Sequence, residues 1–134
     1  MNEDKWTNKL ENYRRALLSL EEAKGQYLIN PANKVIRAGL IKNFEFCIEL
    51  AWRVMKLYLE GKGEKDSSTP KDVLRKAYEH KLINEGEQWL RMVDYRNETS
   101  HNYDEDFSVK MATMIVEEFS PLFHKFYDWI QTQS

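Results

Sequence analysis

The chain has 134 residues, with 20 Lys and Arg against 22 Asp and Glu, and 42% of its residues are hydrophobic. The net charge of −2 excludes a strongly basic domain that coats nucleic acid by charge alone, and the apolar content is sufficient for a packed core. Because 5 Gly and 3 Pro are few for a turn-rich β domain, we expect a single all-α domain over residues 1–134.

Two long helices are expected in the first half of the chain. Apolar residues recur every three or four positions from Asp4 to about Tyr27, which is typical of one helical face. Asn30 and Pro31 have the residue types of an N-cap and a first helical position, and the helix that they start is expected to reach about Leu59. Its apolar surface is wide enough to predict burial on two sides, one against the core and one against a partner chain.

Two shorter helices follow. Thr69 before Pro70 predicts an N-cap, and the helix that it starts is expected to end near His80. Asn84 begins a similar capping pattern. The helix after Asn84 is expected to end between Glu98 and His101.

The last helix is expected to begin after an acidic run and to reach about Ile130. The run Asp104–Asp106 puts negative charge at its N-terminus, where the helix dipole favours it. Pro121 should kink this helix within the preceding turn, because it removes a backbone hydrogen bond and clashes with a carbonyl group. The fold class predicted from these elements is an antiparallel four-helix bundle with one additional short helix.

Several classes of protein are disfavoured by what the sequence contains. Apolar runs of three residues are too short to cross a membrane, and the polar N-terminus predicts no signal peptide, so we expect a soluble, cytoplasmic protein. The single cysteine, Cys47, lies in the apolar phase of the second helix and is expected to be a buried core residue. His80 and His124 provide no second Glu-x-x-His pair beside Glu98 and His101, so we expect no metal and no cofactor.

The segment from Asp94 to Tyr103 is the best candidate for a functional site. Polar and aromatic residues follow one another here at the end of a predicted helix, although a solvated helix terminus would have a similar composition. Arg96 and His101 would lie about 140° apart on a continuous helix, so they converge only if the helix ends between them or if a second copy supplies one of them. Asn97, four residues before His101, could hold the imidazole while the helix lasts.

These residue types suit the cleavage of RNA. A histidine of near-neutral pKa can move a proton, and an arginine can hold a phosphate through two parallel hydrogen bonds. With the 2′-hydroxyl of RNA as the nucleophile, such a pair needs no metal ion.

The sequence from Arg96 to Tyr103, Arg-Asn-Glu-Thr-Ser-His-Asn-Tyr, matches the Arg-x4-His-x-Tyr motif of HEPN-domain proteins. Most of the chain resembles the branch of nucleotidyltransferase substrate-binding proteins, or HepT-like toxins, including the segments Phe44–Phe46 and Glu49–Trp52. This resemblance implies a helical bundle that forms two-fold homodimers and that binds a minimal nucleotidyltransferase encoded beside it.

The resemblance also implies roles for the motif residues. In toxin members, the Arg and His of both protomers meet in one cleft and cleave RNA without metal. Arg96 would then hold the scissile phosphate, His101 would be the acid or base, and Asn97 would orient His101. Tyr103 would be the site at which the partner, acting as antitoxin, attaches AMP.

Such a cleft needs further positive charge. Arg53 and Lys56 on the second helix are the candidates, and the acidic run Asp104–Asp106 would repel RNA unless it points away. Three functions stay open: a ribonuclease toxin, a non-catalytic subunit that presents substrate to the nucleotidyltransferase, and a helical adaptor whose motif is only a dimer contact.

Overall fold

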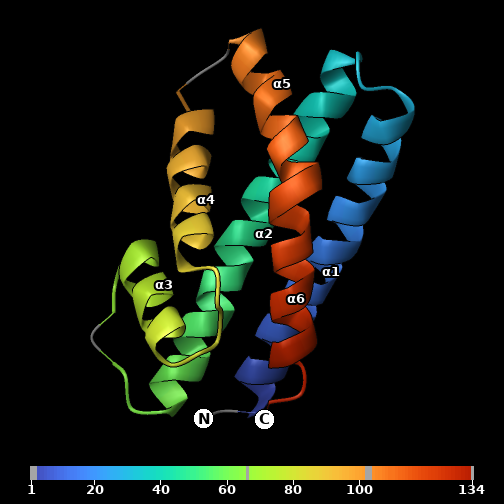
Figure 1. Cartoon of the computed structure of the whole chain (residues 1–134). Helices are drawn as coiled ribbons and strands as arrows, with labels where there is room; N and C mark the ends of the chain where they lie inside the picture. The colour runs from blue at the N-terminus through green and yellow to red at the C-terminus, as the bar shows by residue number, and fades with distance from the viewer. Residues whose placement is uncertain (1–2, 66, 102–103, 134) are drawn as a thin grey trace.

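The computed structural model describes residues 3–65, 67–101 and 104–133, and all regular structure in these ranges is helical. In Figure 1 the last three elements follow one another as a single rod, so four long rods form the bundle and α3 packs beside α2. This arrangement confirms the predicted fold class. The elements are α1 (Glu3–Ile29), α2 (Lys34–Gly61), α3 (Pro70–Glu79), α4 (Gly86–Thr99), α5 (Glu105–Met114), the π-helical turn η1 (Ile115–Phe119) and α6 (Ser120–Ile130).

The start predicted for the second helix at Asn30 was wrong by three residues. The N-cap of α2 is Asn33, whose Oδ1 accepts hydrogen bonds from the backbone N–H groups of Val35 at 2.9 Å and Ile36 at 3.0 Å. Asn30 instead ends α1, because its N–H donates to the carbonyl of Gln26. Two asparagines in one turn compete for the cap, and the one that satisfies two orphan amides begins the helix.

The N-cap predicted for α3 is present, whereas the one predicted for α4 is not. Thr69 caps α3 as predicted, since its Oγ1 accepts from the N–H of Asp72 at 3.2 Å. The capping role expected of Asn84 was wrong, because α4 follows Glu85 and has no side-chain cap. A Cβ atom at Gly86 would lie 3.0 Å from the ring of Tyr78, so glycine allows α4 to begin close against α3.

The long C-terminal rod changes from α-helix to a π-helical turn just before Pro121, which lies at the start of α6. Asp104 caps its first helix by accepting from the N–H of Asp106. In η1, the N–H of Ser120 donates to the carbonyl of Ile115, five residues back, instead of the usual four. The turn before Pro121 is therefore π-helical, and the kink expected there stays a prediction.

The central helix of the bundle is α2, which packs against α1, α3, α4, α5 and α6. Most of the apolar breadth that predicted a partner chain is buried within this one chain, but Val35 and Phe46 stay exposed on α2. Cys47 is among the buried residues, as expected. No helix in the described part of the chain is long and apolar enough to span a bilayer. The largest fully buried aromatic side chains are Tyr13, Phe44, Trp89, Phe119 and Phe123.

Candidate functional site

Contacts with neighbouring helices hold the last turns of α4 in place. Asp94 forms an ion pair with Lys71 of α3 at 2.6 Å. The ring of Tyr95 packs against those of Phe107 and Phe119, with centroids 6.2 Å and 6.1 Å away. The motif that begins at the end of α4 is therefore fixed to α3 on one side and to the C-terminal rod on the other.

Arg96 is anchored to α2. Its Nη2 lies 2.8 Å from Oε1 of Glu49, and its Nη1 donates to Oδ1 of Asn97 at 3.4 Å. The other carboxylate oxygen of Glu49 lies 3.4 Å from Nη2 of Arg53. One carboxylate thus bridges two guanidinium groups, and the side chain of Arg96 remains 40% exposed. The sequence patterns did not single out Glu49 as a site residue, although it lies in a segment that carries the family resemblance.

The end of α4 separates Arg96 from His101. The helix stops at Thr99, and the N–H of His101 donates to the carbonyl of Glu98 at 3.0 Å in the turn that follows. A helix end between Arg96 and His101 was one of the two arrangements that would allow these side chains to converge. His101 is exposed, and within the described ranges its side chain makes no hydrogen bond or ion pair with Arg96.

The expected link between Asn97 and the imidazole is not formed in this single chain. Oδ1 of Asn97 accepts from Arg96, and no hydrogen bond joins Asn97 to His101 among the residues that the structure describes. Tyr103, the predicted modification site, lies outside the described residues.

Of the two additional cations expected near the motif, Arg53 lies close to it and Lys56 does not. Arg53 contacts Glu49 and stacks over the ring of Trp52, 5.3 Å from its centroid, whereas Lys56 lies farther along α2 and is half-buried. In the acidic run, Asp104 caps α5, and Glu105 points to Arg37.

The other candidate groups have structural roles. Burial raises the pKa of the Cys47 thiol to about 12, and its Sγ lies 3.4 Å from the carbonyl oxygen of Ala16. His80 contacts Glu64 at 3.2 Å, and His124 contacts Glu21. In the parts of the chain that the structure describes, no three His, Cys, Asp or Glu side chains are grouped in a way that could hold a metal ion.

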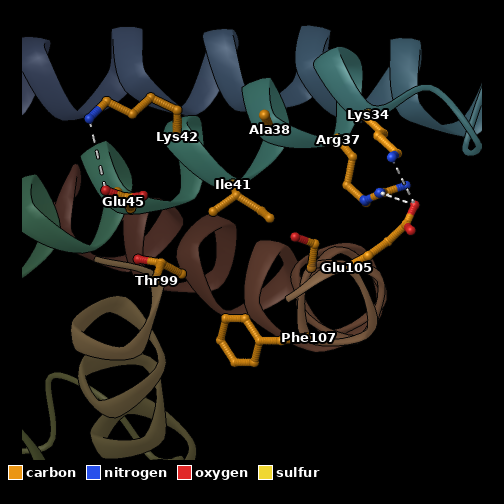
Figure 2. A pocket seen from close by; sticks show the side chains of 10 residues that line it. Lys34, Arg37, Ala38, Ile41, Lys42, Glu45, Thr99, Glu105 and Phe107 are labelled. Atoms are coloured by element: carbon orange, nitrogen blue, oxygen red, sulfur yellow. Dashed lines mark hydrogen bonds and ion pairs between the residues drawn. The ribbon is translucent and has the colours of Figure 1, made fainter. Parts of the chain in front are cut away.

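A pocket of about 360 Å³ opens beside the motif, between the first half of α2, the end of α4 and the start of α5. Figure 2 shows Lys34, Arg37 and Lys42 along one side of this pocket and Glu105 facing Arg37. Thr99, three residues after Arg96, also lines it. The pocket therefore adjoins the motif.

Comparison with known protein families identifies the family of this chain. The model of the family "Nucleotidyltransferase substrate binding protein like" matches residues 8–132. The chain belongs to this HEPN/HepT-like family. A curated relative, "Probable ribonuclease HepT" of Haemophilus influenzae, is 34% identical over 82 aligned residues, and the match covers 58% of this chain. The match spans only 56% of that relative's length.

Solved structures share the HepT-like fold along nearly the whole chain. A tri-AMPylated HEPN toxin of Shewanella oneidensis in complex with its MNT antitoxin has a TM-score of 0.80 at 19% identity, covering 99% of this chain and 100% of that one. A protein of Thermus thermophilus has a TM-score of 0.76 at 28% identity, covering 85% of this chain and 94% of its own.

Proposed function

We propose that this chain is the HEPN subunit of a two-component toxin–antitoxin system and that it cleaves RNA without a metal ion. It works as a cytoplasmic homodimer and is neutralised by a minimal nucleotidyltransferase. The observation that carries this proposal is the end of α4 between Arg96 and His101. It leaves a guanidinium group, oriented by Glu49, and an imidazole exposed at the same end of the helix.

The reaction proposed for this pair is an internal transesterification of RNA. The 2′-oxygen forms a bond to the adjacent phosphorus while the bond from phosphorus to the 5′-oxygen breaks, which leaves a 2′,3′-cyclic phosphate and a free 5′-hydroxyl. One imidazole accepts the proton of the 2′-hydroxyl, and an imidazolium gives a proton to the departing 5′-oxygen. Arg96 binds the non-bridging oxygens, on which negative charge develops.

This chemistry also supports the homodimer. A base and an acid act in the same step, but the motif of one chain supplies only His101. The other two histidines, His80 and His124, contact carboxylates on other parts of the bundle. A second copy of the chain would bring the second imidazole. Because Oδ1 of Asn97 accepts from Arg96, Asn97 would orient one of the two rings through its side-chain N–H.

The proposed partner rests on the relatives. The Shewanella structure contains a tri-AMPylated HEPN toxin with an MNT antitoxin, which supports a minimal nucleotidyltransferase as the partner of this chain. We extend the modification to Tyr103, the tyrosine of the motif. An AMP group attached there would add a phosphate that can pair with Arg96 and compete with RNA.

Cleavage of mixed cellular RNA in the presence of EDTA tests the enzymatic function. Arg96→Ala and His101→Ala should each lower the rate by roughly 10²–10⁴-fold, whereas the wild type should be unaffected by EDTA. Arg75→Ala and His80→Ala are matched controls, since both are exposed residues of the same types near α3. Circular dichroism checks folding. Equal activity in every variant would indicate a contaminating nuclease and would favour the non-catalytic subunit.

A further inference from the structure

The pocket beside the motif contains an arginine whose charge is poorly compensated. Only 6% of the Arg37 side chain is exposed, although it faces into the pocket (Figure 2). Among the described residues, its guanidinium makes two long contacts: Nη2 to Oε1 of Glu105 at 3.3 Å and Nη1 to the carbonyl of Pro31 at 3.4 Å. Charge-assisted hydrogen bonds in proteins are typically about 2.7–2.9 Å, and a buried charge is costly unless it is well paired. The position of Arg37 therefore suits a ligand with stronger acceptors.

The carboxylate that now faces Arg37 is easily displaced. The Glu105 side chain is 59% exposed, and its second contact, to Lys34, is 3.9 Å long. Glu105 lies at the first position of α5, so its side chain can swing into solvent without moving the helix. A carboxylate and a phosphodiester both present two oxygens to a guanidinium fork. Glu105 thus occupies the position that a phosphate group would take.

The charges around this position favour an anion. Lys34 and Lys42 line the pocket together with Arg37, and Lys42 is already paired with Glu45 at 3.9 Å. When Glu105 moves out, Lys34 and Arg37 lose the carboxylate that they share within the described residues. Two cations, one of them buried, then face the same space.

We propose that this pocket is a second phosphate subsite for single-stranded RNA. Arg37 and Lys34 bind a backbone phosphate away from the scissile bond and displace Glu105. The inference rests on the proposed function, because the pocket adjoins the motif that would cleave the RNA. Thr99 lines the pocket and lies three residues after Arg96. Arg37 and Glu49, the partner of Arg96, lie on α2 about three turns apart, roughly 18 Å along the helix, a span that a few nucleotides of RNA can cover.

Binding of a short, fluorescein-labelled single-stranded RNA of mixed sequence tests this subsite by fluorescence anisotropy. The measurements use the full chain carrying His101→Ala, so that the RNA is not cleaved. Arg37→Gln should weaken RNA binding about tenfold or more. The fall in the logarithm of the binding constant with the logarithm of salt concentration should become less steep by about 0.7, because one phosphate contact is lost. Glu105→Gln should tighten binding, because it removes the competing carboxylate. Thermal melts identify any variant that fails to fold. Lys34→Gln, at an exposed residue, is a further variant and should weaken RNA binding less than Arg37→Gln does.

Charge-matched controls separate the subsite from general electrostatics. Arg75→Gln and Glu22→Gln make the same changes in net charge on exposed parts of α3 and α1. They should shift binding much less than Arg37→Gln and Glu105→Gln. If the pocket variants behave like these controls while the wild type still binds and cleaves RNA, the subsite is wrong and the proposed function stands. If the wild type neither binds nor cleaves RNA, both proposals fail.

A free nucleotide offers the same phosphate chemistry as RNA. AMP is therefore titrated against the same variants. AMP binding that depends on Arg37, without RNA binding that depends on Arg37, would overturn the assignment to RNA.

Discussion

Oε1 of Glu49 on α2 lies 2.8 Å from Nη2 of Arg96 on α4. This ion pair joins the central helix to the motif helix and sets the direction of the guanidinium. It also places a negative charge beside the group that would bind the scissile phosphate. Glu49 therefore acts on Arg96 in two opposite ways: it holds the side chain in position, and it weakens its attraction for an anion.

Glu49→Gln should separate these two effects. Loss of the negative charge should tighten RNA binding and lower KM, while the less firmly held Arg96 should lower kcat by about tenfold. Steady-state cleavage kinetics measure both constants. Glu60→Gln, a half-buried residue farther along the same helix, is the control and should change neither. A fall in KM with kcat unchanged would show that Glu49 does not position Arg96.

The contact between α1 and α6 should make stability depend on acid pH. Oε1 of Glu21 lies 2.7 Å from Nε2 of His124 and 3.3 Å from Nζ of Lys24. Burial alone would raise the pKa of Glu21, but hydrogen bonds from His124 and Lys24 outweigh it and lower the pKa below the ordinary 4.5. The ionised Glu21 thus stabilises the fold above pH 4.5, and this contribution is lost as the pH falls through the lower, folded-state pKa.

Thermal unfolding over a series of pH values tests this dependence. Glu21→Gln should reduce the loss of stability below pH 4.5 and should lower stability near neutral pH. Glu22→Gln, an exposed neighbour on α1, should leave the curve close to that of the wild type. Parallel curves for wild type and Glu21→Gln would show that this contact does not contribute.

Local signals in the sequence predicted local structure well. The cap at Thr69 and the end of α4 depend only on residues within a few positions of each other, and both were predicted within the stated limits. The error at the start of α2 arose where Asn30 and Asn33 offered competing caps within one turn. Propensity alone does not decide between two equivalent caps, because the choice depends on how α1 and α2 pack.

Tertiary relationships were the part that the sequence did not reveal. The wide apolar surface of α2 was expected to be covered by the core and by a partner chain, but most of it is covered by the other helices of the same chain. The ion pair of Glu49 could not be predicted for the same reason. No sequence pattern indicates that a half-exposed glutamate on a helix will contact an arginine 47 positions away on α4. Arg37 likewise has its carboxylate partner, Glu105, on a distant element.

The homodimer remains a prediction, and its expected contact now shifts to Phe46. This side chain is 53% exposed on α2, under the ammonium group of Lys42 and close in sequence to Glu49. Light scattering at low micromolar concentration should give about twice the 16.0 kDa chain mass. Phe46→Asp should return the mass to that of one chain, whereas Leu18→Asp, equally exposed on α1, should not. A monomeric wild type would contradict both the dimer and the composite site.

Modification of Tyr103 can be tested with the intact protein. Incubation with the cognate nucleotidyltransferase, ATP and magnesium should raise the mass of the chain by whole AMP units and should suppress RNA cleavage. Tyr103→Phe should abolish the mass increase, and Tyr78→Phe, at an exposed tyrosine on α3, should preserve it. A mass increase that persists in Tyr103→Phe would assign the acceptor to another residue, and no increase in the wild type would mean that the partner inhibits by binding alone.

The π-helical turn η1 corrects the register of the C-terminal rod. Met111, Ile115, Phe119 and Phe123 are all buried at successive four-residue steps. In an uninterrupted α-helix each such step overshoots a full turn by about 40°, so three steps would carry the last side chain about 120° away from the first. The wider turn absorbs this drift. If η1 became an ordinary α-helical turn with no residue removed, α5 would rotate by about 120° relative to α6, which would take Glu105 away from Arg37 while the core of α6 stayed in place. Deleting one residue from η1 would instead restore ordinary α-helix and keep the present register.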